Sequence, residues 1–173
     1  EAIAREKRQV FSTFTGSQVG FVPEDDAFAS FLADGVAGRV VYYGPSSTRG
    51  YLGARRVGPH QTILEFEWGE ARLELSGEHM VHNALAAVSV AQELGVEPAT
   101  IAAGLESARP AFGRGEYVDG PIQVLHDAYN ANPESMIASL SAFFAVSHEG
   151  RRLLVLGGMR ELGEYSARAH LRG

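Results

Sequence analysis

The sequence has no cysteine among its 173 residues, which excludes a disulfide framework and thiolate chemistry. It also lacks an excess of basic residues: the chain has 15 Lys and Arg against 21 Asp and Glu, which gives a net charge of -6. Nucleic acids and anionic membranes both call for a basic surface, so we expect neither as a partner. A phosphate ligand would have to be held by a few local side chains.

Two longer patterns are missing as well. No apolar run approaches the roughly 20 residues of a membrane span, and no signal segment opens the chain, so we expect a cytoplasmic protein without an integral membrane segment. No Gly-x-x-x-x-Gly-Lys-Ser/Thr motif occurs, so the loop that commonly cradles ATP phosphates is absent. What the chain does have is 45% hydrophobic residues, enough for a packed core.

The hydrophobic period changes along the chain in a way that indicates an α/β fold. Strict alternation from Tyr51 to Leu75 predicts an antiparallel meander with a turn at Gly69-Glu70. Before it, the spacing predicts a helix over 1–14, a strand over 19–22, a helix over 28–32 and a strand over 39–43. After it, helices are predicted over 77–91 and from Pro98 to Leu105.

The C-terminal third predicts two β/α units. Strands are expected over 122–125 and 153–156, each followed by a helix, over 133–146 and after Gly163. Because a right-handed crossover returns the chain beside its starting strand, we expect the two strands to be parallel neighbours in a Rossmann-like arrangement.

The run Asp127 to Met136 lies where the first of these strands gives way to a helix, and ligands of open α/β sheets bind at such places. Asp127 could accept hydrogen bonds from both ribose hydroxyls of a nucleotide. Tyr129 offers a flat face to a base or sugar, and Asn130 tolerates the left-handed backbone that such a loop needs. The plainer alternative is a tight connection that ends in an ordinary N-cap at Asn132.

This run resembles the signature of the Mur ligase family, within it the members that add D-alanyl-D-alanine to UDP-N-acetylmuramoyl-tripeptide in peptidoglycan synthesis. Further blocks match that family in the same order along the chain. They are Gly77 to Ala87, Phe112-Gly-Arg-Gly-Glu116 and Val155 to Gly163, with His170 beyond.

The resemblance implies a domain division that the composition alone does not reveal. Residues 1–111 would be the C-terminal portion of a central ATP-binding domain, 112–120 a linker, and 121–173 the N-terminal portion of a Rossmann-like ligase domain. The first residue is Glu rather than Met, and the phosphate loop of the family is missing. We therefore expect an interior piece of a longer enzyme, without turnover on its own.

The resemblance also implies the reaction, which is ATP-dependent amide formation with magnesium. ATP phosphorylates the terminal carboxylate of the muramoyl tripeptide, and the amine of D-alanyl-D-alanine attacks the acyl phosphate. Catalysis of this kind rests mainly on positioning and charge neutralisation.

Site roles follow from the family residue by residue. Lys7 would be the catalytic lysine, carbamylated by carbon dioxide so that its oxygens bind magnesium. Arg114 would reach the phosphates across the linker. The remaining nucleotide contacts implied are His79, Asn83, Asp127, Tyr129 and Asn130. The plainer alternatives are a lysine that extends to solvent at Lys7 and an ordinary surface arginine at Arg114.

The sequence departs from the family at two places. Met80 stands where an asparagine is usual, and Gly158 replaces a usual aspartate in the loop that faces the incoming dipeptide. Asp25 and Asp26 resemble a family acidic pair, although the macrodipole alone favours Asp at a helix start, and we expect capping as their main role. Glu161 and His170 keep their family places, and we assign them no catalytic part.

Other interpretations stay open. A zinc site of His79, His82 and His126 lacks a fourth ligand with suitable spacing. A related ligase is a second alternative: one adding the third peptide residue, a folylpolyglutamate synthetase or a cyanophycin synthetase. A third is a non-catalytic nucleotide-binding module with a degraded ligase fold. We also expect the chain to self-associate through uncovered apolar faces and strand edges.

Overall fold

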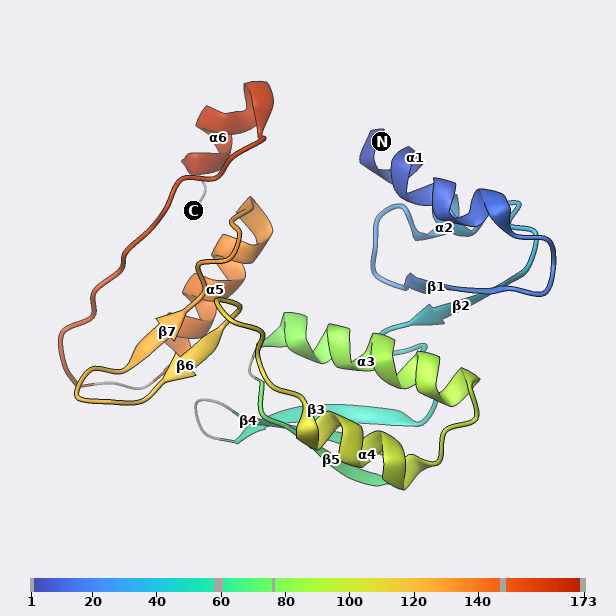
Figure 1. Ribbon diagram of the computed structural model, residues 1–173, viewed down its shortest axis with the longest axis horizontal. Coiled ribbons are helices and arrows are strands. Elements are labelled where there is room, and N and C mark those ends of the chain that lie inside the picture. Colours follow the sequence, from blue (N-terminus) through green and yellow to red (C-terminus); the bar gives the residue numbers. More distant parts are fainter. Residues whose placement is uncertain (1, 58–60, 76, 147–148, 172–173) are drawn as a thin grey trace.

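The computed structural model describes residues 2–57, 61–75, 77–146 and 149–171 and has a mixed α/β architecture (Figure 1), as predicted. Glu1, which we expected inside the first helix, lies outside the described residues. Within the described ranges, none of the helices combines the length and apolar character needed to cross a bilayer.

The first part of the chain forms a small parallel sheet where the hydrophobic pattern predicts it. Its elements are α1 (Ala2–Arg8), the 3-10 helix η1 (Gln9–Thr13), β1 (Val19–Pro23), α2 (Ala29–Ala33) and β2 (Arg39–Tyr43). β1 and β2 pair in parallel, with Val19 opposite Arg39. Parallel strands end at the same edge of a sheet, so the loops after Pro23 and Tyr43 are brought together.

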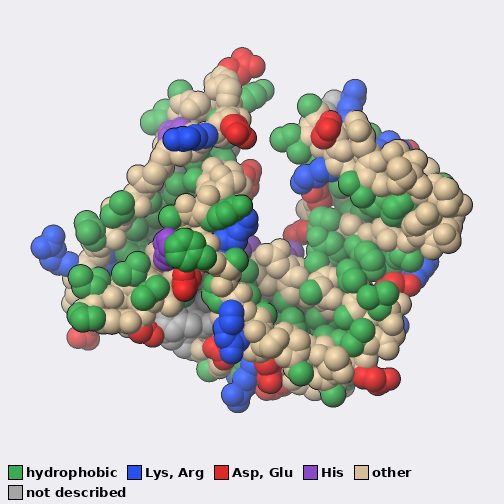
Figure 2. Space-filling view, in the orientation of Figure 1, with side chains coloured by type: hydrophobic (Ala, Val, Ile, Leu, Met, Phe, Trp, Pro, Cys, Tyr) green, Lys and Arg blue, Asp and Glu red, His purple; other side chains and the backbone are tan. Residues whose placement is uncertain are grey.

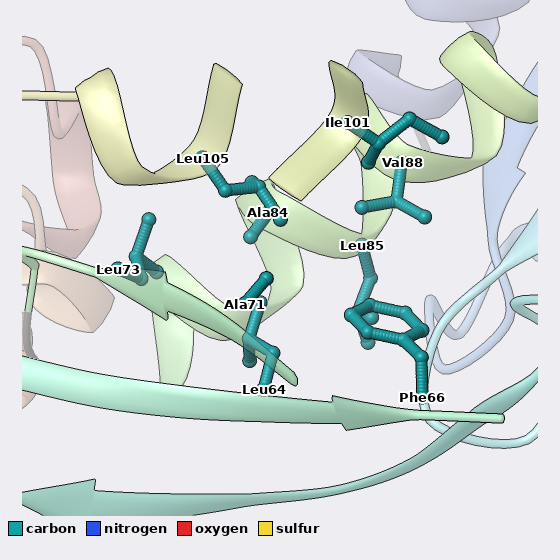
Figure 3. Close-up of a cluster of buried hydrophobic side chains, with 9 residues drawn as sticks. All are labelled: Leu64, Phe66, Ala71, Leu73, Ala84, Leu85, Val88, Ile101 and Leu105. Atoms are coloured by element: carbon teal, nitrogen blue, oxygen red, sulfur yellow. The ribbon is translucent and has the colours of Figure 1, made fainter. Parts of the chain in front are cut away.

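The main core lies between an antiparallel meander and two helices. The elements are β3 (Tyr51–Val57), β4 (Gln61–Phe66), β5 (Gly69–Leu73), α3 (Glu78–Glu93) and α4 (Pro98–Ser107), with strand order β3-β4-β5. Leu64, Phe66 and Leu73 of the sheet pack in one cluster with Leu85 and Val88 of α3 and with Leu105 of α4 (Figure 3). Burying a side chain of this size contributes about 1.5–3 kcal/mol, so this cluster is the main source of stability that the fold shows.

The turn between β4 and β5 lies earlier than the predicted Gly69-Glu70. Glu67 and Trp68 form it, and Gly69 already pairs with Phe66 as the first residue of β5. Two contacts fix the turn there: the Trp68 ring stacks on Phe66 at 4.5 Å between centroids, and the Glu67 N–H donates to the Gly50 carbonyl at 2.7 Å. Neither contact is visible in a pattern of alternation.

The C-terminal part consists of a hairpin and three helical segments. Its elements are β6 (Glu116–Val118), β7 (Val124–His126), α5 (Pro133–Ala145), η2 (Gly163–Tyr165) and α6 (Ser166–His170). β6 and β7 are antiparallel, with Glu116 opposite His126.

The prediction of two parallel neighbouring strands in this part is wrong. The strand expected over 122–125 forms at Val124–His126 and pairs with β6, and within the described residues 153–156 belongs to no strand. Leu153 and Val155 are 77% and 88% exposed. An apolar run indicates a preference for burial, but it does not say which strand will lie beside it.

Candidate functional site

The loop between β7 and α5 carries the side chains that the sequence singled out. Asp127 follows β7 directly and is exposed. Asn132 caps α5 as predicted: its Oδ1 accepts from the Ser135 N–H at 2.8 Å, and the Ser135 hydroxyl oxygen accepts from the Asn132 N–H at 3.1 Å. This reciprocal capping box fixes where the helix begins and therefore how the loop leaves β7.

The left-handed backbone expected in this loop does not occur. Among the described residues Glu161 has the one positive φ outside glycine, and Asn132 is extended with φ of -135°. Asn130 instead accepts a hydrogen bond from the Ala131 N–H at 2.9 Å through Oδ1. Its side chain holds the local turn while the rest of the residue stays exposed.

The linker, through Gly113 and Gly115, is hydrogen-bonded to the loop between β7 and α5. Oδ1 of Asp127 accepts from the Gly115 N–H at 3.1 Å, and the Tyr129 N–H donates to the Gly113 carbonyl at 2.9 Å. Both glycines have φ of +69°, a conformation that disfavours any side chain. A Cβ at Gly113 would also lie 3.3 Å from the Tyr129 nitrogen, so this close approach requires glycine.

Arg114, between the two glycines, lies over the Tyr129 ring at 4.0 Å from its centroid. No carboxylate of the described residues forms an ion pair with it. Its positive charge is therefore held in place by an aromatic face and left uncompensated, which suits an anionic ligand.

The N-terminal half of α3 carries the exposed residues His79 and Asn83. Met80, which stands in place of the usual asparagine, packs against the main core, and its sulfur lies 3.9 Å from Nδ2 of Asn83, within range of a weak hydrogen bond. The departure therefore puts a partly buried thioether beside Asn83.

Sequence reasoning missed Glu24, at the edge where β1 and β2 both end. Its carboxylate accepts from the Ser46 N–H at 2.8 Å. Burial works to raise the pKa of Glu24, but hydrogen bonds from Ser47 and Ser46 outweigh it and leave that pKa lowered. The rule that polar groups gather at the carboxyl ends of parallel strands could have found this residue.

The capping role expected for Asp25 and Asp26 is wrong for both, because the N-cap of α2 is Phe28. Oδ1 of Asp26 accepts from the Phe28 N–H at 2.7 Å and forms a turn before α2, whose N-cap position has no side-chain hydrogen bond. Asp25 instead lies 3.6 Å from Nδ1 of His82 on α3. It ties the loop after β1 to α3.

Lys7 lies in the last turn of α1 and is exposed. The structure records no contact between its side chain and Asn83, Arg114 or Asp127 among the described residues. Its neighbour Arg8 is engaged locally, over the Phe31 ring at 4.8 Å and with the Asp34 carboxylate at 3.8 Å.

The irregular segment that contains Gly158 is held by α6. Nδ1 of His170 lies 2.8 Å from the Ser166 carbonyl and must donate to it, so Nε2 is the acceptor of the Met159 N–H at 3.1 Å. His170, to which we assigned no catalytic part, therefore positions this segment.

Two of the three histidines weighed as zinc ligands have other partners. His82 lies beside Asp25, and His126 lies 3.6 Å from the Glu116 carboxylate and edge-on to Phe112 at 4.9 Å. In the described part of the chain, no three His, Asp or Glu side chains group as a metal site would require.

The predicted residues thus fall into separate groups. Arg114, Asp127 and Tyr129 are in contact through the linker, whereas Lys7 and Asn83 belong to other elements. An open notch separates the part of the molecule that carries α5 and α6 from the part that carries α1 and α2 (Figure 2). The two lobes would have to approach each other to complete a single site.

Comparison with known proteins places this geometry in a family. The Mur ligase middle domain matches residues 1–91, and the Mur ligase glutamate ligase domain matches residues 113–173. The UDP-N-acetylmuramoyl-tripeptide--D-alanyl-D-alanine ligase of Treponema pallidum is 38% identical over 99% of this chain, which spans 37% of that protein. Its counterpart in Mycobacterium tuberculosis is 35% identical over 98% of the chain.

Solved structures agree with these matches. A crystal structure of MurF from Acinetobacter baumannii has a TM-score of 0.85 and 30% identity, covering 97% of this chain and 38% of that one. MurF from Thermotoga maritima in complex with ADP, at 23% identity and a TM-score of 0.76, covers 97% of this chain and 40% of that one and shares the fold. The chain belongs to the Mur ligase family.

Proposed function

We propose that this chain is the part of an ATP-dependent amide ligase that brings the two nucleotide-binding lobes together. The reaction would join D-alanyl-D-alanine to UDP-N-acetylmuramoyl-tripeptide, as the names of its relatives state for those proteins. The observation that carries the proposal is the contact of Arg114 and Tyr129, together with Asp127, at one end of the linker. The chain spans 37% of the Treponema relative, so the complete reaction belongs to a longer protein.

The residues present fit ATP. Oδ1 of Asp127 is used by the linker, which leaves Oδ2 to accept from a ribose hydroxyl. Arg114 carries an uncompensated guanidinium, whose donor geometry matches phosphate oxygens. Asn83 and His79, exposed on α3, and Asn130, exposed beside Tyr129, are the further proposed contacts to the nucleotide.

Lys7 is the proposed magnesium ligand of this chain. Modified to a carbamate, it would offer the hard oxygen donors that magnesium prefers. In nucleotide sites this ion commonly takes one or two protein oxygens together with phosphate oxygens, so a single exposed lysine fits such a role. The ion would neutralise phosphate charge when bound.

The chemistry that the chain itself performs is positioning. Asp127 fixes the sugar, Arg114 holds phosphate oxygens as charge develops, and closing the notch excludes water from the activated carboxyl group. Because such a reaction consumes ATP, we place the protein in the cytoplasm. The exposed apolar segment 153–156, which belongs to no strand within the described residues, supports self-association of the isolated chain, which light scattering would detect.

An acceptor test on the complete gene product separates this proposal from the related ligases. Phosphate release should require UDP-N-acetylmuramoyl-tripeptide, ATP and D-alanyl-D-alanine together, and single amino acids should not replace the dipeptide. Activity with glutamate or with a diamino acid, and none with the dipeptide, would overturn the substrate assignment.

The alternative of a non-catalytic nucleotide-binding module is supported by Met80 and Gly158, which replace two side chains usual in the family. It predicts that the complete gene product binds Mg-ATP in calorimetry but releases no phosphate with any acceptor. Restoring the family residues with Met80→Asn and Gly158→Asp would then be expected to raise turnover. Under our proposal the unmodified protein is already active.

A further inference from the structure

The linker residues that contact the loop after β7 continue the β6–β7 hairpin. Gly113 and Tyr129 lie equally far beyond the Glu116 and His126 pair, so their hydrogen bond falls on the same antiparallel register. Gly115 and Asp127 lie between these two pairs and are joined through the Asp127 side chain. The segment 113–115 is a turn, not a further stretch of strand, but it is bound to the hairpin in the same register.

Because 113–115 is bound to the loop after β7, Arg114 moves with the lobe that carries Asp127. An arginine in a free linker would sample many rotamers and would follow neither lobe. Here its backbone is bound on both sides to the loop that carries Asp127, and its guanidinium rests on Tyr129. Because Phe112 packs on His126 and the Arg114 N–H donates to the Ala111 carbonyl at 2.9 Å, a rotation between the lobes must take place before Ala111, in the segment 108–110.

We propose that Tyr129 is a positioning residue that holds Arg114 on its ring, so that Arg114 and Asp127 meet a nucleotide triphosphate as one preassembled unit. This inference rests on the proposed function. It differs from the sequence expectation for Tyr129, because one face of the ring is occupied by Arg114. Tyr129 would act on the phosphates through Arg114 and would not contact the base.

A double-mutant cycle in the complete gene product tests the proposal, with the Kd for Mg-ATP, kcat and KM measured for Tyr129→Leu, Arg114→Ala and the pair. Tyr129→Leu should weaken nucleotide affinity about three- to fivefold, the strength of an exposed cation–π contact. In the Arg114→Ala background it should cause no further loss. A loss of similar size in both backgrounds would show direct contact of Tyr129 with the nucleotide and would overturn the proposal.

Two further variants control for folding. Tyr129→Phe keeps the ring and should recover most of the affinity lost in Tyr129→Leu. Tyr165→Leu removes a similarly exposed tyrosine, 68% against 66%, and should leave affinity unchanged.

A readout without nucleotide keeps the inference separate from the proposed function. In spectra of the present chain, the Arg114 side-chain protons should show an upfield ring-current shift that Tyr129→Leu abolishes and Tyr129→Phe retains. The amides of Gly115 and Tyr129 should exchange slowly, because both donate to the opposite segment. Unshifted Arg114 protons or unprotected amides would overturn the proposal. If the ring-current shift and the protected amides are present but the complete gene product does not bind Mg-ATP, only the proposed function is overturned.

Discussion

The Asp25 carboxylate lies 3.6 Å from Nδ1 of His82 and so joins the loop after β1 to α3 one residue before Asn83. The pair connects the parallel sheet with the helix that carries two of the proposed nucleotide contacts. Because the Asp25 side chain is 59% exposed, water screens most of the attraction.

We expect the coupling free energy between Asp25 and His82 to be below about 1 kcal/mol in a double-mutant cycle of Asp25→Ala and His82→Ala. It should weaken further in high salt. Chemical unfolding at two salt concentrations measures it. A coupling free energy of several kcal/mol that salt does not affect would contradict the view that solvent screens the attraction between Asp25 and His82.

The lowered pKa of Glu24 predicts a pH dependence. Since the pKa in the folded state lies below that of the unfolded chain, the stabilisation is present above the ordinary glutamate pKa and is lost as the pH falls through the lowered one. Glu24→Gln should therefore destabilise the protein at about pH 7 and much less at about pH 3. Unfolding midpoints of the two proteins measure this, with Glu149→Gln as an exposed control. An equal difference at both pH values would contradict the assignment.

The main core predicts that shortening the buried side chain of Leu85 lowers the free energy of unfolding strongly. Leu85 has no exposed surface, so Leu85→Ala should lower the free energy of unfolding by about 2–5 kcal/mol. Leu94→Ala, at a residue that is 76% exposed, should change it by less than about 0.5 kcal/mol. Fluorescence of Trp68, the single tryptophan, reports on this core because its ring stacks on Phe66. Similar costs for the two variants would mean that α3 is not packed as described.

The capping box predicts a local effect on α5. Asn132→Ala should cost about 1 kcal/mol in the stability of that helix, because the Ser135 N–H loses its acceptor. Hydrogen exchange of the first-turn amides measures it without requiring global unfolding. Ser141→Ala, on the exposed side of the same helix, should have almost no effect.

The contact of His170 with Met159 predicts that removing the imidazole lowers the hydrogen-exchange protection of the Met159 amide alone. His170→Ala leaves the Met159 N–H without its acceptor, so this amide should exchange roughly fivefold faster, equivalent to about 1 kcal/mol. Arg168→Ala on the same helix, an exposed residue, serves as the control. Unchanged exchange at Met159 would show that another group holds this segment.

Patterns within one element were predictable from the sequence. The strand over 39–43 and the cap at Asn132 were predicted and are confirmed, because each depends on neighbouring residues. The same holds for α3, whose buried stripe includes Leu85 and Val88.

Relationships between distant segments were not predictable. The stack of Arg114 on Tyr129 and the contact of Asp25 with His82 each depend on how two segments far apart in the sequence meet. The hairpin of β6 with β7 replaced the expected parallel pairing for the same reason, since periodicity reports burial and not the identity of the neighbour.

The exposed run Leu153–Leu156 has a practical consequence. Proteases bind their substrates as extended chains. Within the described residues this stretch belongs to no helix or strand, and it carries large apolar side chains on the surface. An enzyme that cuts beside leucine and valine should nick the isolated chain there first and sever α6 from α5. Resistance to that cut would then measure how completely any binding partner shields these four side chains.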